Sequence, residues 1–154
     1  MTFSKPSALA LAMAVTLASL DARLGSQSMT VTTTGGEVRV QAPGFRFISD
    51  HTLARLKDGL TVRVEIEMRV LAGPGAATAA AQNRQTFVLS YDLWEERFAA
   101  TVSGTGSRSI SHLTAAAAEA WCIQQLMVPV NGLGSLRSQP FWICLLYTSD
   151  AADE

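Results

Sequence analysis

The chain has 154 residues, of which 48% are hydrophobic and 16% charged, and its formal net charge is −1. This length predicts one domain with a single hydrophobic core. The Arg residues are scattered along the chain instead of forming a stripe that follows phosphates, so the sequence does not predict a nucleic-acid-binding protein.

Residues 1–22 have the pattern of a secretory signal peptide. Lys5 supplies a positive charge, and the uncharged apolar stretch Ser7–Leu20 is too short to span a bilayer as a helix. Ala18 and Ala22 are alternative cleavage points. An uncleaved anchor or a buried N-terminal helix are the other interpretations. We therefore expect an exported protein, periplasmic or in the cell envelope, that touches a membrane only if this segment stays uncleaved.

A β-hairpin is expected next. Met29–Thr33 and Glu37–Gln41 are rich in β-forming residues, and they flank Thr34–Gly36, where glycine can adopt the positive φ of a tight turn. In this hairpin Val38 and Val40 would face the core.

A short helix near residues 50–57 and a strand follow. Ser49 and Asp50 can cap the helix, and Gly59 ends it. From Leu60 to Val70 the apolar and polar residues alternate without a break, which predicts a strand with one buried and one solvated face.

Downstream, a second hairpin is expected. Gln85–Tyr91 and Phe98–Val102 repeat the alternation on either side of the connection Asp92–Glu96. The preceding segment, Ala72–Arg84, opens with Gly-Pro-Gly and has no hydrophobic period, so we expect an exposed loop there.

The main helix is predicted near residues 115–126, with Thr114 as its N-cap and Pro129 closing it, and Gln139–Ile143 begins a last strand. The fold class is therefore mainly β. We expect an antiparallel β-sandwich or half-open barrel, with helices covering an edge or an open end, in a single domain over 23–143.

The last eleven residues, Cys144–Glu154, resemble a translated sequencing adapter, because CLLYTSDAADE is what a transposase mosaic end and its read primer encode in one frame. We expect residues 144–154 to be non-native and the domain to be truncated after Ile143. The other interpretation is that they continue the last strand.

Excluding both chain ends leaves eleven basic and nine acidic residues, a net charge of +2. It also replaces an apparent Cys122–Cys144 disulfide with a lone Cys122, expected as a buried hydrophobe.

Three motifs carry a resemblance to known sequences: Leu89–Phe98, Ser111–Cys122 and Pro140–Trp142. Together they resemble a family of uncharacterised exported bacterial proteins, a domain of unknown function with a signature close to Leu-Ser-Tyr-x-x-Leu-x-x-x-Phe/Tyr. The resemblance implies an exported domain, and it supplies no catalytic residues.

Candidates for catalysis are few. His51 and His112 are the only histidines, and no metal-ligand spacing accompanies them, so we expect neither a metal nor a cofactor. Ser111 and His112 could serve as nucleophile and base, although neighbours on a strand point to opposite faces. Asp92, Glu95 and Glu96 could form a carboxylate pair for glycoside chemistry, but beside Arg97 they favour a solvated turn.

Trp94 is the most informative aromatic residue because it falls in a connection. With Tyr91, Glu95 and Arg97 it could bind an envelope protein or a peptidoglycan-like cell-wall component, although a lid folded back over the core is the favoured interpretation of Trp94.

Two functions of the protein remain compatible with the sequence. The preferred one is a noncatalytic binding or structural protein of the envelope, acting through an edge strand or the Trp94 connection. The alternative is a small periplasmic hydrolase.

Overall fold

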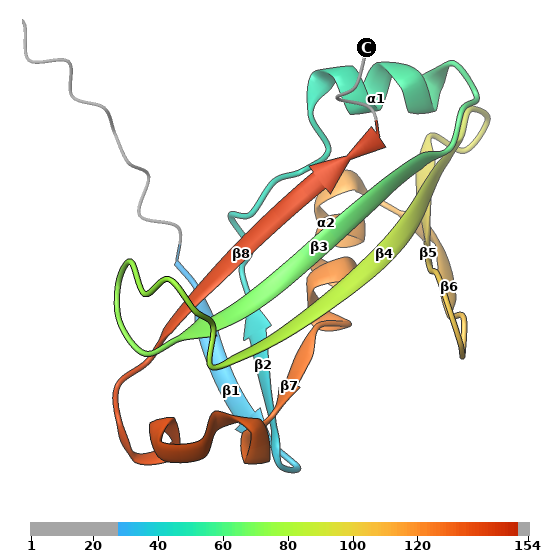
Figure 1. Cartoon of the computed structure of the whole chain (residues 1–154). Helices are drawn as coiled ribbons and strands as arrows, with labels where there is room; N and C mark the ends of the chain where they lie inside the picture. Colours follow the sequence, from blue (N-terminus) through green and yellow to red (C-terminus); the bar gives the residue numbers. More distant parts are fainter. Residues whose placement is uncertain (1–27, 151–154) are drawn as a thin grey trace, which may run out of the picture.

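The computed structural model describes residues 28–150, which form two antiparallel sheets in a sandwich-like, mainly β arrangement (Figure 1). The smaller sheet has the strand order β1-β2-β7 and the larger one β6-β5-β4-β3-β8. The predicted fold class is thereby confirmed. In chain order the elements are β1 (Thr30–Thr34), β2 (Glu37–Gln41), α1 (Asp50–Lys57), β3 (Val62–Leu71), β4 (Ala81–Asp92), β5 (Arg97–Val102), β6 (Ser109–Leu113), α2 (Ala115–Gln124), β7 (Met127–Pro129), the 3-10 helix η1 (Val130–Ser138) and β8 (Trp142–Ser149).

The core lies between the larger sheet on one side and α2 with the smaller sheet on the other. Helix α2 contacts β5 and β2, and α1 packs on β3 and β4 near the end of the larger sheet (Figure 1). Strand β3 follows its predicted alternation, and all five of its inward side chains are fully buried: Val62, Val64, Ile66, Met68 and Val70. Leu60, which was expected on this face, precedes the strand and is exposed, because β3 begins only at Val62.

Local signals in the sequence explain three of the elements. Gly35 and Gly36 both have positive φ, 62° and 78°, in the two-residue turn between β1 and β2, as the hairpin prediction required. The Ser49 side chain accepts a hydrogen bond from a backbone N–H of α1, and Thr114 does the same for α2. Gly59, at φ 81°, follows the end of α1.

Other boundaries differ from the predicted ones. Strand β4 already begins at Ala81, so the C-terminal end of the expected loop is part of the sheet, paired with β3. Helix α2 ends at Gln124, two residues before its predicted end, and a turn at Gln125 and Leu126 leads into β7, which pairs with β2. Both boundaries depend on pairing with strands that are distant in the chain, and the hydrophobic periodicity of a segment does not reveal its pairing partners.

Strand β8 pairs with β3 from Leu71↔Trp142 to Val64↔Ser149, so Cys144 to Ser149 continue the strand. Its Ile143 and Leu145 pack against the core, but no residue of β8 is itself buried. The expected signal segment and residues 151–154 lie outside the described part of the chain.

The two cysteines are both free thiols in this structure. Cys122 is buried in α2, and burial raises the pKa of its thiol to about 12. This agrees with the interpretation of Cys122 as a small hydrophobic residue. Cys144 is half-buried on β8.

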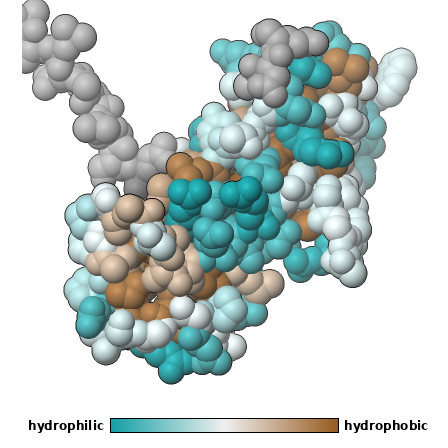
Figure 2. Space-filling view, viewed as in Figure 1, coloured by the Kyte–Doolittle hydropathy of each residue, from teal (hydrophilic) through white to brown (hydrophobic). Residues whose placement is uncertain are grey.

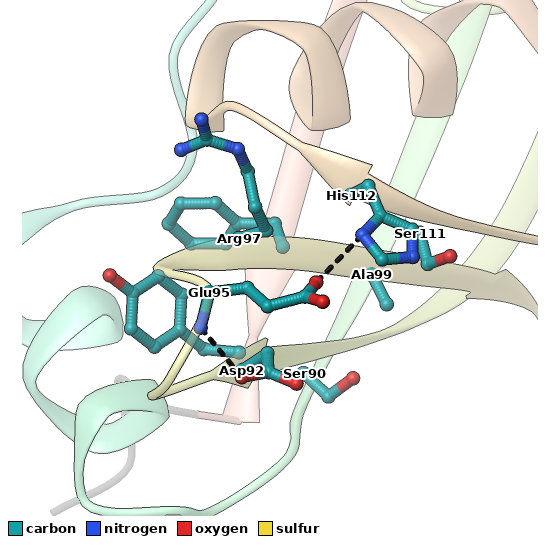
Figure 3. A pocket seen from close by; sticks show the side chains of 9 residues that line it. Ser90, Asp92, Glu95, Arg97, Ala99, Ser111 and His112 are labelled. Atoms are coloured by element: carbon teal, nitrogen blue, oxygen red, sulfur yellow. Dashed lines mark hydrogen bonds and ion pairs between the residues drawn. The ribbon is translucent and has the colours of Figure 1, made fainter.

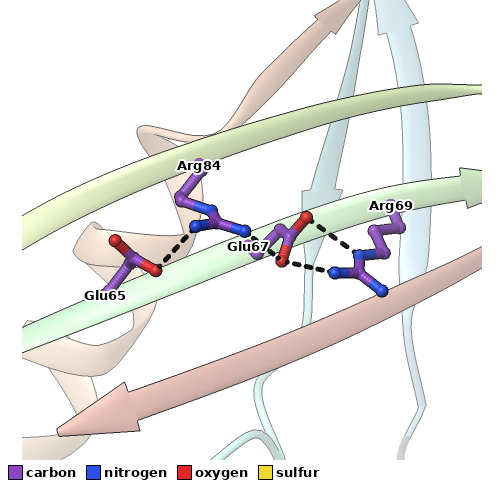
Figure 4. Close-up of polar contacts among 4 residues, drawn as sticks. All are labelled: Glu65, Glu67, Arg69 and Arg84. Atoms are coloured by element: carbon purple, nitrogen blue, oxygen red, sulfur yellow. Dashed lines mark hydrogen bonds and ion pairs between the residues drawn. The ribbon is translucent and has the colours of Figure 1, made fainter. Parts of the chain in front are cut away.

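The outward face of the larger sheet is polar. Glu67 is almost inaccessible between Arg69 at 2.8 Å and Arg84 at 3.2 Å, and Arg84 also pairs with Glu65 at 3.3 Å (Figure 4). The hydrogen bond from Arg69 is the main reason why the pKa of Glu67 lies below its usual range. Figure 2 shows a hydrophilic band over the middle of this face. Among residues 28–150 no helix combines the length and apolar character needed to cross a bilayer.

Candidate functional site

A small open hollow of about 240 Å³ lies at the end of the larger sheet where β4 turns into β5 (Figure 3). Six candidate residues that the sequence suggested for different reasons line it together: Tyr91, Asp92, Glu95, Arg97, Ser111 and His112. They come from the end of β4, the β4–β5 turn, the start of β5 and the middle of β6. The antiparallel pairing of these three strands therefore unites the binding candidates with the hydrolase candidates.

The turn between β4 and β5 is organised by one carboxylate. Asp92 Oδ1 accepts hydrogen bonds from the backbone N–H of Trp94 at 2.8 Å and from that of Glu95 at 2.9 Å. These bonds, with that from Glu95 the larger cause, hold the pKa of Asp92 below its usual range, and the nearby His112 lowers it further. The backbone of Trp94 is thus held by an ionised side chain at neutral pH.

Trp94 projects into solvent from this turn. Its exposed fraction is 96%, and the neighbouring Leu93 is 55% exposed. The interpretation of Trp94 as a lid folded over the core is therefore wrong. The physical reason is that the turn is short and lies beyond the last paired residues of the hairpin, so its side chains extend past the end of the core.

Strand β6 contains a β-bulge at the hollow. The pairing with β5 passes from Ala100↔Ile110 to Phe98↔Leu113. Two residues, Ser111 and His112, consequently oppose the single Ala99, and His112 adopts φ 59°. Both side chains line the hollow, so the expectation that they point to opposite faces of a strand was wrong.

The bulge brings His112 to the turn. Its Nδ1 lies 2.7 Å from Glu95 Oε2, and the two side chains point toward one another across the hollow (Figure 3). A carboxylate on Nδ1 fixes the orientation of an imidazole and leaves Nε2 free to exchange a proton. Both side chains are more than half exposed, however, and no hydrogen bond joins Ser111 to His112 among the described contacts. The arrangement therefore holds an oriented imidazole without an activated nucleophile.

Backbone strain is concentrated at this place. Within residues 28–150, Glu96 at φ 53° and His112 at φ 59° are the only non-glycine residues with positive φ. Such conformations cost free energy and persist only where the surroundings impose them, which is common at binding and active sites. Both residues belong to the segments that form the hollow, so strain and polar side chains coincide.

One of the residues suggested by the sequence, His51, does not belong to the hollow. His51 is exposed on α1 and does not line the hollow, and the described residues contain no group of three potential metal ligands. Ser90 also lines the hollow, and it was missed because serine in a strand is an ordinary solvent-facing residue.

No protein-family model, no curated protein and no solved structure matches this chain. Function is therefore argued from the site.

Proposed function

We propose that this protein is a noncatalytic binding module of the cell envelope, which holds another envelope component through the β4–β5 turn. The signal-like pattern of residues 1–22 supports export. The fold supports a binding role because it offers a stable sheet whose end carries a projecting turn.

One observation carries the proposal: Trp94 is 96% exposed on a turn whose backbone is held by Asp92. A tryptophan exposes a large apolar area, and leaving it in water is unfavourable. When its backbone is already fixed, less conformational entropy is lost as it docks into a partner. Such residues dominate binding energy at protein surfaces.

The test compares two tryptophan variants of the full chain. Immobilised wild-type protein, Trp94→Ala and Trp142→Ala are each incubated with separated bacterial cell-wall and envelope-protein fractions. Trp142 is the matched control because it is also exposed, at 44%, but stands at the opposite end of the sheet. We expect only Trp94→Ala to lose retention. The thermal unfolding midpoint of both variants should equal that of the wild type. Equal retention by all three proteins would refute the proposal.

A small hydrolase is the second candidate, and the 2.7 Å contact between Glu95 and His112 is the observation that favours it. In this function Glu95 would orient His112, which would act as general base for Ser111 or a water molecule. An activity abolished by His112→Ala and retained by Trp94→Ala would support this candidate over the binding module.

A further inference from the structure

The hollow beside Trp94 presents hydrogen-bonding groups that the protein itself leaves available. Among the described residues, no protein partner bonds the hydroxyls of Ser90 and Ser111, Glu95 Oε1 or His112 Nε2. Hydroxyls both donate and accept, a carboxylate accepts, and an imidazole nitrogen does either according to its protonation. The hollow therefore offers donors and acceptors side by side over a small area.

The charges at the hollow nearly cancel. Asp92 and Glu95 carry negative charge, Arg97 carries positive charge, and His112 adds a second positive charge when it is protonated. Neither an anion nor a cation would gain much Coulomb energy in such a mixed environment. A neutral ligand with many hydrogen-bonding groups suits it better than a charged one.

The turn combines this hollow with an exposed aromatic face. Trp94 and Glu95 are neighbours in the chain; Glu95 lines the hollow, and Trp94 is almost fully exposed. A ligand that fits both must therefore have an apolar face close to a rim of hydroxyl groups. Sugar rings have this construction, because their C–H groups form an apolar face and their hydroxyls lie around the edge.

A protein pocket fits the same surface less well. It would cover Trp94 but bring its rim against Asp92, Glu95 and His112. Each polar group buried there without a partner would weaken the binding of such a pocket. Hydroxyls of a saccharide can instead bond the charged side chains, and such hydrogen bonds are stronger than those between neutral groups.

We infer that the envelope component bound at the Trp94 turn is a neutral saccharide, whose ring stacks on Trp94 and whose hydroxyl groups bond Glu95, His112 and the two serines of the hollow. This inference rests on the proposed binding function and names the ligand class for the same site.

The test titrates the purified full chain with soluble hexasaccharides of β-1,4-linked N-acetylglucosamine, of β-1,4-linked glucose and of an anionic uronic acid, by calorimetry. We expect a neutral hexasaccharide to bind with little dependence on salt. Trp94→Ala should weaken binding about tenfold or more, and Trp94→Phe less, because a flat ring remains. Glu95→Gln should weaken it several-fold through the lost charge on the acceptor. Trp142→Ala is the control and should bind like the wild type.

Failure of this inference can be distinguished from failure of the proposed function. If only the anionic hexasaccharide binds, or if none binds while Trp94-dependent retention of envelope proteins survives, the saccharide inference is overturned and the binding function stands. If Trp94→Ala behaves like the wild type with every fraction and every sugar, both are overturned. Unchanged thermal unfolding of Trp94→Ala excludes misfolding as the cause of a loss.

Discussion

Glu95 and His112 form a side-chain pair, with Oε2 of the carboxylate 2.7 Å from Nδ1 of the imidazole, that joins the β4–β5 turn to the bulge of β6. The pair links the two strained segments of the structure, since Glu95 precedes Glu96 and His112 is itself at positive φ. The turn that presents Trp94 is therefore held from two sides. Asp92 accepts hydrogen bonds from its backbone N–H groups, and His112 contacts the side chain of Glu95.

This pair should couple the two segments weakly but measurably. In a double-mutant cycle of Glu95→Ala and His112→Ala, we expect a coupling free energy of about 0.5 kcal/mol, because both side chains are mostly exposed and solvent screens them. When His112 is protonated, the coupling should shrink as salt is added. A parallel cycle of Glu96→Ala with His112→Ala is the control and should give additive changes in unfolding free energy. Coupling of equal size in both cycles would contradict a specific pair.

The positive φ of His112 should make glycine better than alanine at this position. Both His112→Ala and His112→Gly lose the contact with Glu95, but alanine keeps the steric cost of φ 59° whereas glycine does not. We expect His112→Gly to be more stable than His112→Ala by about 1 kcal/mol in urea unfolding, after allowance for the greater freedom of glycine in the unfolded chain. Greater stability of the alanine variant would mean that the bulge relaxes out of this conformation.

Asp92 should make the turn sensitive to acid. Its folded pKa is lowered by the backbone bonds from Glu95 and Trp94, whereas in the unfolded chain it titrates near its ordinary pKa of about 3.9. The stabilisation is thus complete above the unfolded pKa and is lost as pH falls through the folded one. We expect the chemical shifts of the backbone N–H groups of Trp94 and Glu95 to change over this acid range.

Asp92→Asn tests the cause of this acid transition. The amide oxygen of asparagine can still accept the two backbone bonds, but it does not titrate, so the acid-induced change at Trp94 should largely disappear. Glu96→Gln is the control and should leave the transition in place. If Asp92→Asn keeps the full transition, another carboxylate is responsible.

The sequence predicted β3 well and the hollow poorly, for different physical reasons. Alternation predicts a half-buried strand because one register alone buries all the apolar side chains, and Val62 to Val70 follow it. The bulge arises instead from a one-residue mismatch between β5 and β6, which is a property of the pairing and leaves no pattern in either strand. The same mismatch turns His112 toward Glu95. The chemistry-bearing residues could be named from the sequence, but their meeting in one hollow could not.

Glu119 shows the same limit in the core. It lies in an alanine-rich helical stretch and gave no signal in the sequence, yet only 1% of it is exposed. Its Oε1 accepts the backbone N–H groups of Phe47 and Ile48 at 2.8 and 2.9 Å, and Arg46 lies 3.2 Å from Oε2. A carboxylate of α2 therefore fixes the connection between β2 and α1.

Removing Glu119 should destabilise the protein more than any change at the hollow. Glu119→Ala leaves two backbone N–H groups without their acceptor, and we expect a loss of about 3 kcal/mol in unfolding free energy. Glu119→Gln keeps an acceptor oxygen of the same size and should cost about 1 kcal/mol. The exposed Gln124→Ala in the same helix is the control, expected within about 0.5 kcal/mol of the wild type. Similar losses for alanine and glutamine would show that the charge, and not the acceptor, matters.

Strand β8 should make this chain prone to self-association. Within residues 28–150 it is an edge strand of the larger sheet, and Trp142 and Leu146 are 44% and 41% exposed along it. An unpaired edge with exposed apolar side chains is a template for pairing with another chain. Leu146→Lys should reduce association in light scattering, because it charges the edge beside Glu67, its partner in the register of β3 and β8. Leu93→Lys carries the same change on the exposed β4–β5 turn and should leave association unchanged. If instead Leu93→Lys alone reduced association, the apolar tip of the turn and not the edge of β8 would be the self-association surface.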